Sequence, residues 1–176
     1  MEFQHSQTMA NLLAALAGEA QAAAKYGWYA EKAKQEHLRP AAELFEKTAE
    51  NELQHGKIWY ELLHDGIGTT AQNLTLAADG EQFEHSRMYP EFAETARKEG
   101  FDRIAFLFEE VGRIEKSHEV RFRALEQALT GGELFRNGPE TVWVCAACGH
   151  VTVGEQPPEQ CPVCGHPKDF FQPQKS

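Results

Sequence analysis

The sequence predicts an all-α four-helix bundle followed by a small metal-binding module. Four long stretches place apolar residues three and four positions apart, which is the period of one helix face. The four cysteines, by contrast, all lie within the last 32 of the 176 residues. Two Cys-x-x-Cys pairs at one end of a chain are typical of a metal site rather than of disulfides. We therefore expect a bundle over residues 1–137 and a metal module over residues 138–176.

The first two helices are bounded by residues typical of helix ends. The first is predicted over residues 8–36, with Thr8 as its N-cap. Pro40 suits the first turn of the second helix, which Gly66 is expected to end.

The next two helices follow after a short connection. The third is predicted from about Thr70 to Gly100, and Pro90 should kink it or remove one hydrogen bond. The fourth is predicted over residues 102–129, because Gly131 and the glycine after it terminate its apolar stripe.

The composition excludes several classes of function. Hydrophobic residues make up 41% and charged residues 25%, which is typical of a globular protein. With 27 acidic and 17 basic residues the net charge is −10, which argues against a nucleic acid or an anionic membrane as partner. No stretch reaches the roughly 20 apolar residues of a membrane span, and no export signal begins the chain, so we expect a cytoplasmic protein.

Five glutamates lie within the apolar stripes of the predicted helices. They are Glu19, Glu52, Glu81, Glu84 and Glu115. Five unpaired buried carboxylates would cost more than the roughly 5–15 kcal/mol that stabilises a whole domain. The core-facing positions of these helices contain no lysine or arginine, so the sequence predicts bound cations.

The helical part repeats itself. In each half, a glutamate on one helix is followed 33 or 34 residues later by a Glu-x-x-His pair on the next. The two sets are Glu19 with Glu52 and His55, and Glu81 with Glu115 and His118. Residues three apart share one helix face. This pattern is similar to that of ferritin-like di-iron and di-manganese carboxylate proteins.

Oxygen-rich ligation with two imidazoles suits iron or manganese better than zinc. Five carboxylates leave a net charge of roughly −1 with two divalent irons, and the same charge with two ferric irons and an oxo bridge. A change of redox state therefore alters the charge of the low-dielectric core little. We therefore expect two non-haem irons. Glu84 lies outside the repeat and is expected as a further ligand, whereas His85 beside it is expected at the surface.

The cysteines form two knuckles. Cys145 and Cys148 are separated by 12 residues from Cys161 and Cys164, and a glycine follows each pair. This spacing predicts a tetrahedral four-thiolate site but does not separate iron from zinc. A buried metal pair that changes redox state needs an electron supply, which favours one iron here.

The motifs together resemble the rubrerythrin family over nearly the whole chain. They include Gly18-Glu19, Gly80-Glu81-x-x-Glu84, Met88-Tyr89-Pro90, and the second knuckle ending in His166-Pro167-Lys168. A departure is His150 after the first knuckle, where the family more often has an aromatic residue. The resemblance implies a ferritin-like bundle with a rubredoxin-like module.

The resemblance also implies an activity, the reduction of hydrogen peroxide to water. Glu84 resembles a glutamate that one iron exchanges for the second-helix histidine, here His55, when the pair is reduced. Tyr26 and Tyr89 resemble tyrosines beside the carboxylates, which donate hydrogen bonds or protons.

The link between the second and third helices is short. In ferritin-like topology these helices run parallel, so the chain must return along the bundle. The predicted second helix is roughly 38 Å long, whereas residues 65–69 span at most about 18 Å. We therefore expect a homodimer or a larger assembly with swapped hairpins, in which one chain provides Glu19, Glu52 and His55 and another provides the remaining ligands. The alternative is that the third helix starts later than Thr70.

Electrons are expected from a separate donor, such as rubredoxin or an NAD(P)H-dependent reductase. Gly66-x-Gly68 lies in a helix connection and does not form a nucleotide-binding motif. Three alternatives remain open at this stage: an iron-oxidising or iron-handling protein, a di-iron oxidase, and a binding protein with a zinc ribbon and inert metals.

Overall fold

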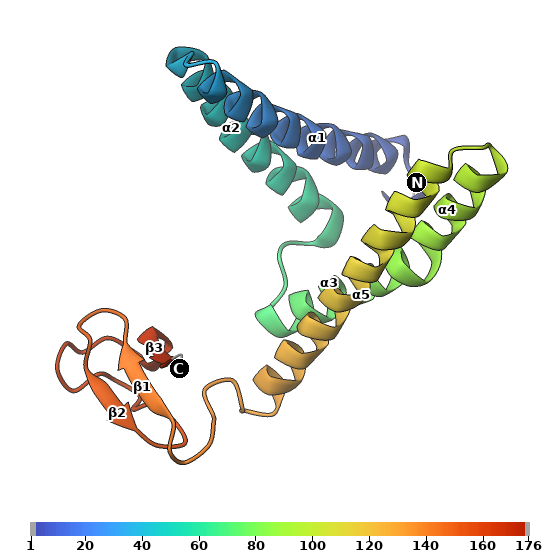
Figure 1. The fold of residues 1–176 in the computed structure, drawn as a ribbon. Helices are drawn as coiled ribbons and strands as arrows, with labels where there is room; N and C mark the ends of the chain where they lie inside the picture. The colour runs from blue at the N-terminus through green and yellow to red at the C-terminus, as the bar shows by residue number, and fades with distance from the viewer. Residues whose placement is uncertain (1–2, 175–176) are drawn as a thin grey trace. The chain divides into compact units, whose positions relative to one another are not determined.

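The computed structural model describes residues 3–174, so the predicted domain ends at residues 1–2 and 175–176 lie outside the described part. The chain forms two compact units, Met1–Ile67 and Gly68–Ser176. Each unit contains one helical hairpin, and the second also contains the cysteine module, residues 138–176 (Figure 1). The predicted four-helix fold with a small metal-binding module is confirmed, while the domain boundary after residue 137 stays a prediction.

The first unit consists of a short 3-10 turn, η1 (Phe3–His5), and the helices α1 (Gln7–Gln35) and α2 (Arg39–His64). The Ser6 hydroxyl accepts a hydrogen bond from the Met9 N–H at 3.1 Å. Ser6 rather than Thr8 therefore caps α1, and the predicted cap is wrong by two residues. Pro40 lies in the first turn of α2 as predicted.

The second unit begins with α3 (Thr70–Phe83), followed by a π-helical turn, η2 (Glu84–Met88), then α4 (Tyr89–Lys98) and α5 (Asp102–Thr130). A capping box begins α3: the Thr69 N–H donates to Gln72 Oε1 at 2.8 Å, and the Gln72 N–H donates to Thr69 Oγ1 at 3.4 Å. The predicted start at Thr70 is thereby confirmed.

The predicted third helix is not continuous. Pro90 has no N–H for the Ser86 carbonyl, so the α-helical ladder cannot run through this point unchanged. Instead the Tyr89 N–H bonds the Glu84 carbonyl, five residues earlier. The interruption therefore precedes Pro90 and takes the form of a π-turn.

Small residues line the contact between the helices of each hairpin. Ala30, Ala42, Ala78 and Ala105 are at most 2% exposed. Large apolar side chains elsewhere on the hairpins stay exposed in this chain; Trp28, for example, is 63% exposed. Each hairpin thus buries an alanine ridge and leaves apolar surface uncovered. Among residues 3–174, no helix is both long and apolar enough to cross a membrane.

The cysteine module contains a three-stranded antiparallel sheet in the order β2-β1-β3. Its strands are β1 (Val142–Cys145), β2 (Val151–Val153) and β3 (Phe171–Pro173), and a 3-10 turn, η3 (Lys168–Phe170), precedes β3. Trp143, Cys145, Cys161 and Phe171 form its core. The Trp143 indole N–H donates to the Gly154 carbonyl at 2.9 Å, which satisfies the one polar atom of this buried side chain.

Candidate metal centres

The first hairpin brings together two carboxylates and an imidazole. Glu19 lies on α1, while Glu52 and His55 lie one turn apart on α2. His55 Nδ1 is 2.8 Å from Glu52 Oε2 and 3.9 Å from Glu19 Oε2. One donor atom from each residue lies within 4.8 Å of the others. These three side chains are therefore close enough to hold one metal ion.

The second hairpin repeats this arrangement with Glu81 on α3 and with Glu115 and His118 on α5. His118 Nδ1 is 3.5 Å from Glu81 Oε2 and also contacts Glu115. The carboxylates are half-buried, with 21% of the Glu81 side chain and 15% of the Glu115 side chain exposed. Each cluster of three donors is called a half-site below.

Glu84 does not belong to the half-site of the second hairpin. It begins the π-turn, and its carboxylate is not among the donor atoms that lie within 4.8 Å of one another. Burial raises the pKa of Tyr89, and the negative charges of Glu84, Glu115 and Glu81 raise it further. The Tyr89 hydroxyl therefore stays protonated at neutral pH and is able to donate a hydrogen bond.

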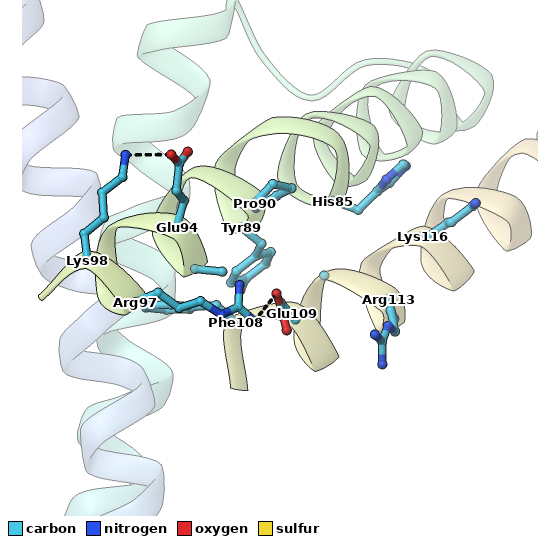
Figure 2. Close-up of a pocket in the computed structure, with 12 residues that line it drawn as sticks. His85, Tyr89, Pro90, Glu94, Arg97, Lys98, Phe108, Glu109, Arg113 and Lys116 are labelled. Atoms are coloured by element: carbon cyan, nitrogen blue, oxygen red, sulfur yellow. Dashed lines mark hydrogen bonds and ion pairs between the residues drawn. The ribbon is translucent and has the colours of Figure 1, made fainter. Parts of the chain in front are cut away.

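The two predicted tyrosines occupy aromatic clusters. The Tyr26 ring centroid lies 6.2 Å from that of Phe45 and 6.3 Å from that of Tyr29. The Tyr89 ring lies 6.1 Å from Phe108 on α5 and 6.5 Å from Phe92 on α4. Figure 2 shows the Tyr89 ring between α4 and α5.

The four cysteines converge at one end of the module. Sγ of Cys145 lies 3.7 Å from that of Cys164, and Sγ of Cys148 lies 3.6 Å from that of Cys161. A tetrahedral ion with metal–sulfur bonds of about 2.3 Å requires sulfurs about 3.8 Å apart. The cluster therefore fits a four-coordinate iron or zinc ion.

Backbone N–H groups tune these thiols unequally. Burial would raise the pKa of Cys161, but the N–H groups of Cys164 and Val163 and the neighbouring thiols lower it to about 6. The His150 N–H would lower the pKa of Cys148, but the other thiols and burial raise it to about 12. Positive φ values at Gly149 (76°) and Gly165 (74°) allow the chain to turn so that these N–H groups face sulfur.

The donor sets fit the predicted metals. Four carboxylates and two imidazoles within the half-sites are hard and borderline ligands that suit iron, and four thiolates suit a single iron or zinc. Both hairpins supply the same donor types from the same helical positions. The arrangement is therefore able to hold a pair of similar ions and one ion of a different kind.

Sequence reasoning missed one polar pair beside the second half-site. His85 Nε2 lies 2.8 Å from Glu119 Oε2, and only 17% and 16% of their side chains are exposed. The expectation that His85 lies at the surface is wrong, because a hydrogen bond to Glu119 offsets the loss of solvent contact when the His85 side chain is partly buried. A signal existed: Glu119 follows His85 by 34 residues, as Glu115 follows Glu81.

Comparisons with known proteins agree with these sites. Residues 10–126 match the family model described as Rubrerythrin, and residues 143–172 match that described as Rubrerythrin, rubredoxin-like domain. Rubrerythrin of Porphyromonas gingivalis is 39% identical over 183 aligned residues, covering 97% of this chain and 92% of that protein.

Two further relatives align over a similar share of the chain. Rubrerythrin of Nitratidesulfovibrio vulgaris is 36% identical, and Rubrerythrin-1 of Clostridium acetobutylicum is 35% identical; each comparison covers 95% of this chain and 94% of the relative. The two half-sites and the cysteine cluster correspond in composition to a di-iron site and a rubredoxin-like site. From the match of its helical part and its alignment to these relatives over nearly its full length, the chain belongs to the rubrerythrin family.

Proposed function

We propose that this protein is a non-haem di-iron peroxidase that reduces hydrogen peroxide to water. The observation that carries the proposal is the pair of matching half-sites, each with two carboxylates and one imidazole, on the same chain as a four-cysteine site. The reaction consumes one peroxide, two electrons and two protons and yields two waters. Family membership implies an oxidoreductase; the choice of peroxide as oxidant is the proposal.

The metal ligands are assigned to the side chains that the hairpins bring together. The proposed di-iron ligands are Glu19, Glu52, His55, Glu81, Glu84, Glu115 and His118. When bound, the two irons supply the two electrons that cleave the O–O bond and act as Lewis acids toward it. Glu84 and His55 are the ligands expected to exchange with the redox state.

The tyrosines provide hydrogen-bond donors next to this site. The raised pKa of Tyr89 keeps its hydroxyl protonated at neutral pH. We assign Tyr89, together with Tyr26 of the other hairpin, to orient the bound oxidant and to supply protons to the oxygens as they leave.

Electrons are proposed to enter through an iron held by Cys145, Cys148, Cys161 and Cys164. Their supply falls to an external rubredoxin or NAD(P)H-dependent reductase. The Cys161→Ser variant separates the two sites: a single oxidation of the reduced protein should continue, while repeated turnover should stop.

We further propose that the active protein is a domain-swapped homodimer. The 26 residues of α2 span about 39 Å, whereas the five residues 65–69 span at most about 18 Å. The chain therefore cannot return to start α3 parallel to α2 within one ferritin-like bundle. A second copy of the chain can supply the missing hairpin instead.

A mixed dimer tests the swap. One differently tagged chain carries Glu52→Gln and the other carries Glu115→Gln. In a swapped dimer both defects fall in one site and the other site is intact, so about half of the activity should remain. If the bundles were not swapped, each site would contain one defect, and the mixed dimer would be as inactive as either parent variant.

The oxidant is tested by anaerobic stopped-flow mixing of the reduced, iron-loaded protein with peroxide and, separately, with dioxygen. We expect much faster oxidation by peroxide. Faster oxidation by dioxygen would contradict the proposal and favour a di-iron oxidase or a ferroxidase. Sizing provides the second criterion, because an iron-storage protein requires a hollow shell of many subunits.

A further inference from the structure

The two hairpins are copies of each other except at the π-turn. On the second helix of each hairpin, Glu115 and His118 lie 63 positions after Glu52 and His55. On the first helix the offset changes along the chain. Glu81 lies 62 positions after Glu19, but Tyr89 lies 63 positions after Tyr26. One extra residue therefore lies between Glu81 and Tyr89.

The π-turn accommodates this extra residue. Tyr26 follows Glu19 by seven residues, which is two helical turns and hence the same face. Tyr89 follows Glu81 by eight, which would place it about 80° away from Glu81 around a regular α-helix. A single π-turn absorbs one residue, so Tyr89 returns to the side of α3 that carries Glu81.

Two contacts from α5 hold the ends of this turn. At one end, His85 Nε2 donates to Glu119 Oε2 at 2.8 Å, because a carboxylate only accepts. At the other end, Tyr89 lies directly on Gly112, where a Cβ would come within 3.2 Å of Tyr89 Cβ. Arg123 Nε lies 3.6 Å from Oε1, the second carboxylate oxygen of Glu119, and this ion pair helps to orient the carboxylate. His85, Tyr89 and Gly112 all line one open cavity of about 590 Å³ (Figure 2).

The first hairpin lacks the polar contact. The positions equivalent to His85 and Glu119 are Ala23 and Gly56, both buried where α1 and α2 meet. The position equivalent to Glu84 is Ala22, and α1 runs through it without interruption. Within the described residues, the second hairpin therefore has three features that the first hairpin lacks. They are the polar pair of His85 and Glu119, the π-turn, and the carboxylate of Glu84.

We propose that His85 and Glu119 are a positioning pair, which holds the π-turn against α5 and thereby fixes where Glu84 and Tyr89 lie beside the second half-site. π-Turns are rare and persist where neighbouring contacts stabilise them. The role of Glu84 as a ligand rests on the proposed function, whereas the placement of the turn does not.

Amide hydrogen exchange of the full-length protein tests the proposal, both metal-free and loaded with iron. Glu119→Gln keeps the size of the side chain but replaces a charge-assisted hydrogen bond with a weaker neutral one, so the amides of residues 84–89 should exchange about fivefold faster. His85→Phe keeps a ring but loses the donor, and should accelerate exchange about tenfold. His85→Gln retains a donor and should restore slow exchange.

Glu109→Gln is the matched control. It is the same substitution on the same helix, and it removes the ion pair between Glu109 and Arg97 that links α5 to α4. If Glu119→Gln and His85→Phe accelerate exchange at residues 84–89 no more than this control does, the proposal is wrong. Equal acceleration throughout α3 and α5 would overturn it as well, since the pair would then be an ordinary helix contact.

Iron binding separates this inference from the proposed function. Glu84→Gln should leave exchange in the metal-free protein unchanged while weakening iron binding. If Glu84→Gln binds iron as the wild type does, the ligand assignment fails, and the positioning of the turn is still decided by the exchange data.

Discussion

Gly112→Ala probes how tightly the π-turn is seated on α5. Glycine inside a helix costs about 1 kcal/mol relative to alanine, so this change should stabilise α5 on propensity alone. The added methyl group would lie 3.2 Å from Tyr89 Cβ, closer than the 3.5–4.0 Å optimum for carbon atoms. Overpacking of this kind costs about 1–3 kcal/mol. We expect the free energy of unfolding to fall by about 1 kcal/mol, the difference between a cost near 2 and a gain near 1.

Gly56→Ala is the matched comparison in the first hairpin. There the new methyl group would lie 3.7 Å from both Glu19 Cβ and Leu16 Cδ1, which is ordinary contact. Only the propensity gain remains, so the free energy of unfolding should rise by about 1 kcal/mol. The two variants should therefore differ in melting temperature by about 4–8 °C.

Helix melting followed by circular dichroism measures both variants, metal-free and iron-loaded. The metal-free pair excludes changes in iron affinity as the cause. If Gly112→Ala stabilised the protein as much as Gly56→Ala, Tyr89 would be free to move away. The contact would then not define the position of the π-turn.

Three further outcomes are expected. Trp143→Phe leaves the Gly154 carbonyl unpaired and should destabilise the cysteine module by about 1–3 kcal/mol. The loss of metal–thiolate absorption in urea measures this stability. As a control, Val151→Thr, at a residue 52% exposed on β2, should change the stability of the module little. Because the pKa of Tyr89 in the folded protein lies above its ordinary value of 10.0, the contribution of Tyr89 to the free energy of unfolding of the metal-free protein should be constant below pH 10 and fall as pH rises beyond it. Tyr89→Phe should remove that part of the decline. The raised pKa of Cys148, about 12, keeps that thiol protonated without metal. The apparent affinity of the module for metal, measured by chelator competition, should therefore increase with pH. A pH-independent affinity would contradict the assignment of Cys148 as a ligand.

The half-sites were predictable because their geometry is local. Glu52 and His55 lie one helical turn apart, so they share a face whatever α2 packs against. The offset of 33 or 34 residues to the preceding helix then brings Glu19 and Glu81 to these pairs, and the structure places all three donors of each half within 4.8 Å. The cysteine cluster was predictable for the same reason, since each knuckle is a short local turn.

The π-turn was not predictable from helical periodicity. A stripe with a period of 3.6 residues assumes an unbroken ladder, and it therefore predicts a continuous helix and an exposed His85. Pro90 predicts only a kink or a lost hydrogen bond. The extra residue itself was visible only in a comparison between the repeats, in the spacing of Glu81 and Tyr89 against that of Glu19 and Tyr26. Glu84 is not among the three donors of the second half-site, so the position of its carboxylate depends on the π-turn in which it lies.

In the proposed dimer, metal binding and hairpin assembly should be thermodynamically linked, so that each one favours the other. Each hairpin buries an alanine ridge, leaves large apolar side chains exposed and offers three donors. Three donors leave coordination positions of an iron ion open, whereas two half-sites together supply four carboxylates and two imidazoles to a metal pair. If two hairpins pair as proposed, the ions would neutralise carboxylates that otherwise repel each other, and the pairing would cover apolar faces. In the proposed dimer, iron would therefore link two hairpins structurally as well as take part in the reaction, because three donors alone leave coordination positions open.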